Sequence, residues 1–213
     1  MYDMIKCDKN KLIFIHLTKT GGESVTKYLK GSSELKFHMP VRYLFNMSNR
    51  GEGPGIGWDP RVIKRFGPLS NDYARAKMTR LWQVWDRYLR FTIVRNPWSR
   101  LVSNYNYNLK KGVESREFEQ FVMDMLLEPH NIWMKSQVWW LSYQGKCLAD
   151  RILRTETLDI DFAKLIPGAE LPHLNQTKNP SKPDADYYSD KTRRIVSLLY
   201  ADDIREFEYE FGK

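Results

Sequence analysis

The chain has 213 residues, 42% of them hydrophobic, and a formal net charge of +8 at pH 7. This length suits a single α/β domain, residues 1–213, and the composition argues against disorder. No apolar run approaches the roughly 20 residues that cross a bilayer. No apolar signal core stands at the N-terminus, and two cysteines are too few for a disulfide scaffold. We therefore expect a cytoplasmic protein that does not associate with membranes.

The positive charge is concentrated between residues 75 and 111. That segment contains nine basic residues and one acid, Asp86, and thus carries a net charge of +8 by itself. A local positive field of this kind favours a polyanionic ligand. The four histidines and two cysteines have no metal-ligand spacing, so the sequence predicts no metal site.

The first predicted element in chain order is a buried strand at Leu12–Ile15, a short run of β-branched and aromatic residues. Residues 18–24 (TKTGGES) follow as a turn, and a helix then places Val25, Tyr28 and Leu29 on one face. Such a strand, turn and helix are the elements of an anion-binding loop.

Lys19 and the glycine pair make this turn suitable for an anion. Glycines let backbone N–H groups approach the ligand, the helix N-terminus adds positive potential, and Lys19 adds a full charge. It is not an ordinary ATP-binding loop, because that motif places its lysine after the second glycine and Lys19 precedes both. A tight strand-to-helix turn with a solvated lysine is the alternative.

The middle of the chain alternates between extended and helical patterns. We expect a short strand that ends at His38, a brief helix at 41–47 and a glycine-rich surface loop at 51–60. A helix at Met78–Leu89, a strand at Arg90–Arg95 and a helix at Trp98–Asn108 should follow. Asn96 is a good N-cap and Pro97 suits the first helical position.

The last hundred residues are predicted in the same way. We expect a helix at Arg116–Leu127, capped by Ser115, that buries Phe118, Phe121, Val122, Met125 and Leu126. A core cluster of Trp133, Trp139 and Trp140, an inner strand at Asp150–Arg154, a helix starting near Glu156–Leu165 and a polar loop at Pro167–Pro183 follow. The chain then ends with a helix capped by Ser189 that buries Ile195, Val196, Leu198 and Leu199, and a closing segment at Ile204–Phe211. A sugar- or base-stacking platform is the alternative for the tryptophans.

Strands that alternate with helices predict a three-layer α/β fold, with a parallel sheet of about four to five strands covered on both faces. Ligands of such sheets bind beyond the carboxyl ends of the strands. Lys19 and Arg95 each follow a predicted strand, so we expect both at that edge.

Arg95 occupies a position where nucleotide hydrolases often carry a magnesium-binding aspartate. No predicted apolar strand ends in a carboxylate, which favours direct anion binding without a metal. Ser103 lies about 9 Å further along the predicted helix, where a phosphate could bridge it and Arg95. The alternative is a helix-capping arginine and an ordinary exposed serine.

Two segments, Phe14–Ser24 and Phe91–Ser103, resemble the nucleotide-binding motifs of sulfotransferases that use 3′-phosphoadenosine 5′-phosphosulfate (PAPS). The similarity is to the carbohydrate type, which includes Golgi heparan and chondroitin sulfotransferases and small bacterial relatives. Weaker matches are Trp85–Tyr88, Leu171–Asn175, Tyr187–Tyr188 and Phe207–Phe211, so the resemblance spans nearly the whole chain. It implies a fold of the P-loop nucleotide hydrolase type. Glu23 departs from the motif, which usually has Ser or Thr there.

The resemblance implies a role for each matching residue. Lys19, Thr20, Gly21, Gly22, Glu23 and Ser24 would hold the 5′-phosphosulfate, and Arg95 and Ser103 would hold the 3′-phosphate. Lys19 would also stabilise the leaving oxygen. His38 is the candidate base for the acceptor hydroxyl, with Glu23 as the second candidate, and the product would be 3′-phosphoadenosine 5′-phosphate (PAP).

Three functions remain open from the sequence. The first is sulfuryl transfer from PAPS to a hydroxyl, expected to be on a carbohydrate, with no metal and no nucleic-acid partner. The second is a nucleotide kinase-like phosphotransferase, and the third is a non-catalytic basic module that binds nucleic acid or other polyanions. The sequence indicates no oligomeric state.

Overall fold

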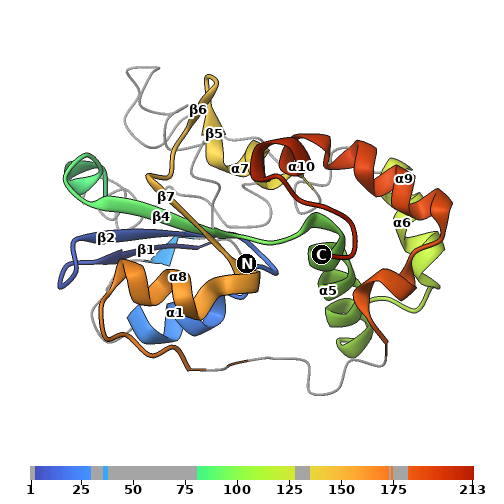
Figure 1. The fold of residues 1–213 in the computed structure, drawn as a ribbon, viewed down its shortest axis with the longest axis horizontal. Coiled ribbons are helices and arrows are strands. Elements are labelled where there is room, and N and C mark those ends of the chain that lie inside the picture. Colours follow the sequence, from blue (N-terminus) through green and yellow to red (C-terminus); the bar gives the residue numbers. More distant parts are fainter. Residues whose placement is uncertain (1–2, 30–35, 38–80, 128–134, 173, 175–181) are drawn as a thin grey trace, which may run out of the picture.

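The computed structural model describes residues 3–29, 36–37, 81–127, 135–172, 174 and 182–213. Its centre is a five-stranded sheet in the order β3-β1-β2-β4-β7 (Figure 1). The strands are β1 (Asp3–Cys7), β2 (Leu12–His16), β3 (Lys36–Phe37), β4 (Leu89–Val94) and β7 (Arg151–Arg154). Strands β2, β4 and β7 are parallel, as predicted, and β1 runs antiparallel to both of its neighbours.

Strand β1 is the main departure from the predicted sheet. It joins β2 through a four-residue turn in which Lys11 has a φ of 54°, and a connection this short allows only antiparallel pairing. The strand was not predicted, because Asp3 and Lys6 interrupt its apolar pattern.

The helices cover both faces of the sheet, which confirms the three-layer α/β prediction (Figure 1). They are α1 (Gly22–Leu29), α5 (Pro97–Lys110), α6 (Phe118–Leu127), α7 (Gln137–Leu141), α8 (Leu158–Leu165), α9 (Asp190–Leu199) and α10 (Ala201–Phe207), with 3-10 turns η3 (Thr155–Thr157) and η4 (Asp184–Tyr187). A separate hairpin consists of β5 (Ser142–Tyr143) and β6 (Lys146–Cys147).

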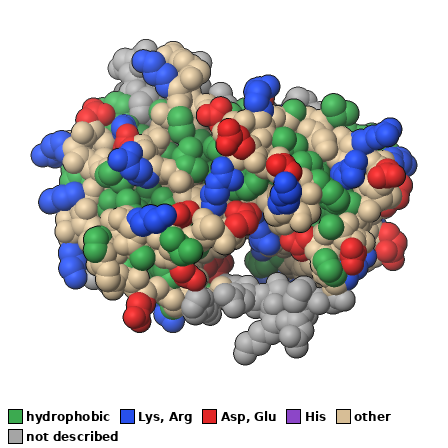
Figure 2. Space-filling model, viewed as in Figure 1, with side chains coloured by type: hydrophobic (Ala, Val, Ile, Leu, Met, Phe, Trp, Pro, Cys, Tyr) green, Lys and Arg blue, Asp and Glu red, His purple; other side chains and the backbone are tan. Residues whose placement is uncertain are grey.

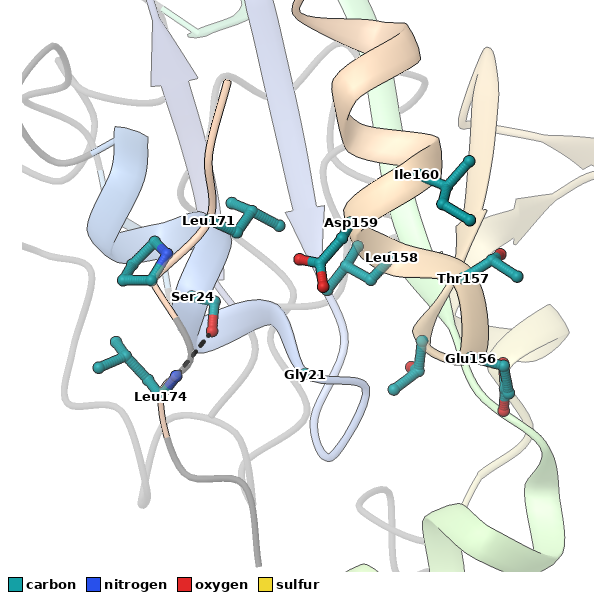
Figure 3. Close-up of a pocket in the computed structure, with 11 residues that line it drawn as sticks. Gly21, Ser24, Glu156, Thr157, Leu158, Asp159, Ile160, Leu171 and Leu174 are labelled. Atoms are coloured by element: carbon teal, nitrogen blue, oxygen red, sulfur yellow. Dashed lines mark hydrogen bonds between the residues drawn. The ribbon is translucent and has the colours of Figure 1, made fainter. Parts of the chain in front are cut away.

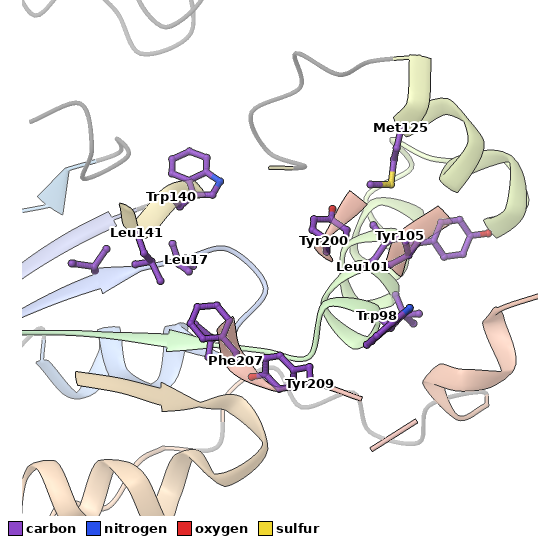
Figure 4. Packing of buried hydrophobic residues seen from close by; sticks show 14 of the residues in the cluster. Leu17, Trp98, Leu101, Tyr105, Met125, Trp140, Leu141, Tyr200, Phe207 and Tyr209 are labelled. Carbon is purple, nitrogen blue, oxygen red and sulfur yellow. The ribbon is translucent and has the colours of Figure 1, made fainter. Parts of the chain in front are cut away.

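Two hydrophobic cores lie on opposite faces of the sheet, because side chains alternate along each strand. On one face Phe14 packs with Val25 of α1 and Phe162 of α8. On the other face Ile13 and Ile15 belong to the core that also contains residues of α5, α6, α7, α9 and α10. Figure 4 shows part of this second core, including Trp98, Leu101 and Tyr105 of α5. Helices α1 and α5, which follow β2 and β4, are thereby fixed to opposite faces.

Several predicted boundaries and buried faces were wrong. The helix expected to reach Leu89 ends at Val84, and Leu89 belongs to β4. Helix α6 begins at Phe118 rather than Arg116, and Leu126 is exposed. Strand β7 is an edge strand of the described sheet rather than an inner one.

Helix α9 is capped by Ser189 as predicted, with a capping box completed by Thr192. Val196 is fully buried, but Leu198 is 79% exposed. Residues two apart in a helix point about 200° from each other, so both could not face the core.

Part of the prediction concerns residues that the structure does not describe. His38, the helix at 41–47, the loop at 51–60, Trp133, His173 and Asn175 all lie outside the described ranges. Of the two other tryptophans in that cluster, Trp140 is in the core and Trp139 packs against it. Among the described helices, none has both the length and the apolar character needed to cross a membrane.

Candidate anion-binding site

Three loops meet at the carboxyl edge of the sheet, after β2, β4 and β7. Carbonyl oxygens of the loop after β2 accept hydrogen bonds from the neighbouring loops and α5. Arg100 Nε donates to Thr18 O at 3.2 Å, and Arg95 Nη1 donates to Lys19 O at 3.4 Å. The Thr155 hydroxyl lies 2.8 Å from Thr20 O. These hydrogen bonds fix the loop through its backbone carbonyl groups.

The backbone of the loop after β2 has the geometry of an anion-binding turn. Lys19 and Gly21 both have positive φ, 64° and 77°. A lysine in this left-handed region costs about 1–2 kcal/mol, and such strain tends to persist at functional sites. Gly22 begins α1, where a Cβ would lie 2.9 Å from Phe14 Cζ and would also clash with the His16 ring. The N–H groups of the first turn of a helix have no acceptors within the helix, and they are the groups that bind anions in such loops.

The Lys19 ammonium is partly enclosed between the loop and α5. Its Nζ lies 4.0 Å from the centre of the Tyr107 ring, a cation–π contact. The pKa of Lys19 is lowered from an ordinary value of 10.5 to about 8, mainly by burial and also by the Arg95 charge, while the Glu23 charge opposes the shift. An anion bound beside Lys19 would favour its charged form.

Arg95 follows β4 and reaches two elements at once. Its Nη1 contacts Lys19 O, and its Nη2 lies 3.7 Å from Asp184 Oδ2 of η4. Burial lowers the pKa of Arg95, and the carboxylates of Asp184 and Glu156 oppose that shift. Lys19 and Arg95 are therefore brought together at one edge of the sheet, as predicted, with an acid beside them that was not predicted.

Ser103 lies on the α5 face that looks toward the loop. Arg100, three residues earlier, binds Thr18 O, and Tyr107, four residues later, contacts the Lys19 ammonium. Residues at these spacings share one side of a helix. Ser103 is half-buried between them, so it lies on the side of α5 that faces the loop containing Lys19.

Thr20, Ser24 and Glu23, the other predicted site residues with side-chain oxygens in this loop, differ in burial and in hydrogen bonding. The Thr20 side chain is fully buried, and its hydroxyl donates to Leu17 O at 2.9 Å. Ser24 Oγ accepts from Leu174 N at 3.3 Å, so its own hydrogen can still be donated to an anion. Glu23 is exposed in the first turn of α1. Thr20 can therefore contribute its backbone, whereas Ser24 can also contribute its side chain.

A buried network holds the backbone of Arg95. Gln137 Oε1 accepts from Arg95 N, and Gln137 Nε2 donates to Arg95 O, both at 2.9 Å. Asp203 of α10 in turn accepts from the backbone N–H groups of Gln137 and Val138, each at 2.8 Å. Gln137 and Asp203 are fully buried. This support orients the turn after β4.

A pocket of about 350 Å3 opens beside the loop, on the side of β7 and α8 (Figure 3). Gly21 and Ser24 border it on one side, and Glu156 and Leu158 on the other. Glu156 Oε1 also accepts from Asn96 N at 2.8 Å. The pocket therefore borders the first motif directly and is linked to the second motif through the hydrogen bond between Asn96 and Glu156.

Thr155 and Glu156 were not identified as site residues from the sequence, although a signal was available. They follow β7 directly, just as Lys19 and Arg95 lie after their own strands. Gln137, Asp184 and Tyr107 had no comparable signal. Within the part of the chain that the structure describes, no group of three or more His, Cys, Asp or Glu side chains is arranged to hold a metal ion.

Comparison with known proteins gave one match. The family model described as "Sulfotransferase family" matches residues 2–210, nearly the whole chain. Searches of curated proteins and of solved structures found no match. The α/β sheet with helices on both faces agrees with the sulfotransferase fold. The extent of the family match and the cationic loops at the sheet edge lead to the same conclusion: the chain belongs to the sulfotransferase family.

Proposed function

We propose that this protein transfers the sulfuryl group of PAPS to a hydroxyl group of an acceptor. The observation that carries the proposal is the contact between the two predicted motifs, in which Arg95 Nη1 binds Lys19 O. Lys19 and Arg95, which come from different loops, would then bind one ligand that carries two separated anionic groups. PAPS has this property, with a 5′-phosphosulfate and a 3′-phosphate.

The described residues fit such a donor. The backbone of residues 19–24, the Ser24 hydroxyl and the Lys19 ammonium would hold the 5′-phosphosulfate, while Arg95 and Ser103 would take the 3′-phosphate. The pocket beside Gly21 and Glu156 has a suitable volume, about 350 Å3, for part of the nucleoside. Its lining includes apolar residues, Leu158, Leu171 and Leu174, which suit a flat ring system.

The protein's contribution to the reaction is positioning and charge stabilisation. When bound, the donor supplies an activated sulfuryl group, and its transfer moves negative charge onto the oxygen that departs with the phosphate. Lys19 would stabilise that charge with its ammonium. The half-buried setting of Lys19 strengthens the effect, because electrostatic interactions grow as water is excluded.

The base that accepts the proton of the hydroxyl is proposed to be His38, with Glu23 as the second candidate. General bases contribute about 10²–10⁴-fold to turnover. We expect His38→Ala to lower kcat by such a factor while the Kd for PAP changes less than about twofold, because the base does not touch the bisphosphate. Steady-state kinetics and calorimetry measure the two quantities, with Glu23→Gln as the matched variant. Full turnover in His38→Ala with loss in Glu23→Gln would move the role to Glu23.

The acceptor is proposed to be a carbohydrate hydroxyl. This rests on the resemblance of the two motifs to carbohydrate sulfotransferases. A cytoplasmic location is likewise a proposal, based on the composition of the chain, which has only two cysteines.

Thermal stabilisation by PAP tests the proposed function directly. A ligand at 100 times its Kd stabilises a protein by about 2.7 kcal/mol, which raises Tm by roughly 5–10 °C for a chain of this size. We expect this shift with PAP and a much smaller one with 5′-AMP or ATP, measured by differential scanning fluorimetry. Equal shifts with PAP and 5′-AMP would rule out a 3′-phosphate site. A magnesium-dependent shift with ATP would favour a kinase, and a salt-sensitive shift with DNA alone would favour a polyanion-binding module.

A further inference from the structure

The 3-10 turn η4 is fixed against α5 and carries an acid into the anion-binding site. The Tyr187 hydroxyl donates to Asn106 Oδ1 at 3.3 Å, and the hydroxyl of Tyr188, directly after η4, donates to Trp98 O at 2.9 Å. The Tyr187 ring also packs edge-on against Phe118 of α6. Asp184 therefore belongs to an anchored segment, and its position beside Arg95 follows from that anchoring.

Two nitrogens of the Arg95 guanidinium lie near two different acceptors. Nη1 binds Lys19 O at 3.4 Å, and Nη2 lies 3.7 Å from Asp184 Oδ2. Figure 2 shows a hollow between the part of the molecule that contains α8 and the part that contains α9, with basic and acidic side chains around it. The Arg95 and Asp184 side chains are only 24% and 37% exposed, so solvent screens this pair less than a surface ion pair.

We propose that Asp184 competes with the 3′-phosphate for Arg95, and thereby weakens binding of the bisphosphate and speeds release of PAP. The inference rests on the proposed function, because it assumes that Arg95 binds the 3′-phosphate. Arginine binds phosphate best through two parallel N–H donors, and the Asp184 carboxylate already lies beside one of these donors, Nη2. A phosphate at Arg95 must displace the carboxylate or accept its repulsion, since like charges side by side disfavour binding.

An acid that only orients Arg95 would change PAP affinity in the opposite direction on its removal. If Asp184 served only to orient Arg95, its removal would loosen the guanidinium and weaken PAP binding. If Asp184 is a competitor, its removal strengthens PAP binding. The two accounts are thus separated by the direction of one measured change.

The test compares Asp184→Asn with Asp186→Asn. Both substitutions lie in η4 and remove one negative charge, but Asp186 is exposed and forms no ion pair among the described residues. We expect Asp184→Asn to lower the Kd for PAP about three- to tenfold, as release of Arg95 from one partly screened ion pair implies, and to change the Kd for 5′-AMP less than twofold. The dissociation rate of PAP should fall by a similar factor, and Asp186→Asn should leave both ligands unchanged. Calorimetry and stopped-flow displacement measure these quantities.

An unchanged or raised Kd for PAP in Asp184→Asn would overturn the inference, as would an equal gain in Asp186→Asn. Failure of the wild-type protein to bind PAP would instead overturn the proposed function, so the two failures are distinguishable. Asp184→Ser serves as a second variant if Asp184→Asn does not fold, and the melting temperature of each variant without ligand checks this. The same criteria apply to either variant.

Discussion

Lys19→Met is expected to lower kcat/KM by about 10²–10³-fold, the usual cost of removing one charge-stabilising donor from an active site. The fold should survive. Lysine already adopts a φ of 64° here, so another residue with a Cβ adds little new strain. Methionine can also keep an apolar contact with the Tyr107 ring. Steady-state kinetics, with a thermal melt to confirm folding, measures the effect.

Lys27→Met is the matched control, because Lys27 is an exposed lysine in the last turn of the same helix that follows the loop. It removes the same charge from the protein and should leave kcat/KM within about twofold, as surface charges contribute little. A similar loss in both variants would mean that general charge, rather than Lys19, determines the rate.

The pKa of Lys19 adds a pH dependence to this prediction. Its pKa is lowered to about 8, and the ammonium is the active form, so activity is present below pH 8 and lost above it. Because kcat/KM reports the free enzyme, we expect it to fall tenfold per pH unit above about pH 8. The residual activity of Lys19→Met should lack this limb. A limb at the same pH in Lys19→Met would assign the ionisation to another group.

The two motifs that form the site were predictable because their signals are local. A β-branched run, a glycine pair and a helical pattern mark β2, its turn and α1. An apolar run followed by Asn96-Pro97 marks β4 and α5, and in the structure the Asn96 side chain accepts from Trp98 N as an N-cap. Each signal lies within about 20 residues, so the physics of one strand and one helix is enough to identify it.

The residues that shape the site around these motifs were not predictable. Gln137 binds Arg95 from 42 positions away in the sequence, Asp203 supports Gln137 from 66 positions away, and Asp184 reaches Arg95 from 89. Nothing in the local pattern of a glutamine or an aspartate says which distant backbone group it will contact. The same holds for the buried sides of α6 and α9, where Leu126 and Leu198 face outward, because neighbouring elements decide how wide the buried face is.

Arg95→Ala is expected to raise the Kd for PAP by about 10–100-fold, the range for losing hydrogen bonds to a charged group. The Kd for 5′-AMP should change less than about threefold, since that ligand lacks the 3′-phosphate. The ratio of the two constants, measured by calorimetry, therefore reports the 3′-phosphate preference. Ser103→Ala should change the ratio in the same direction by a smaller factor, because it removes one neutral donor.

Arg87→Ala is the control for charge, because Arg87 precedes β4 and so lies at the opposite edge of the sheet, with its guanidinium bound to Gln83 O. A strand of six residues spans roughly 20 Å, so Arg87 should not affect either ligand. Equal losses for PAP and 5′-AMP in Arg95→Ala would show that Arg95 acts only by holding Lys19 O.

The double variant Arg95→Ala/Asp184→Asn separates two ways in which Asp184 can weaken PAP binding. If Asp184 competes for the guanidinium, its removal has nothing to release once Arg95 is absent, and the gain in PAP affinity should largely disappear. If Asp184 repels the phosphate directly, the gain should persist. Residues in contact are the ones expected to be non-additive, and the 3.7 Å between Arg95 Nη2 and Asp184 Oδ2 places this pair among them. We therefore expect strong non-additivity, and a full gain in the double variant would contradict competition for Arg95.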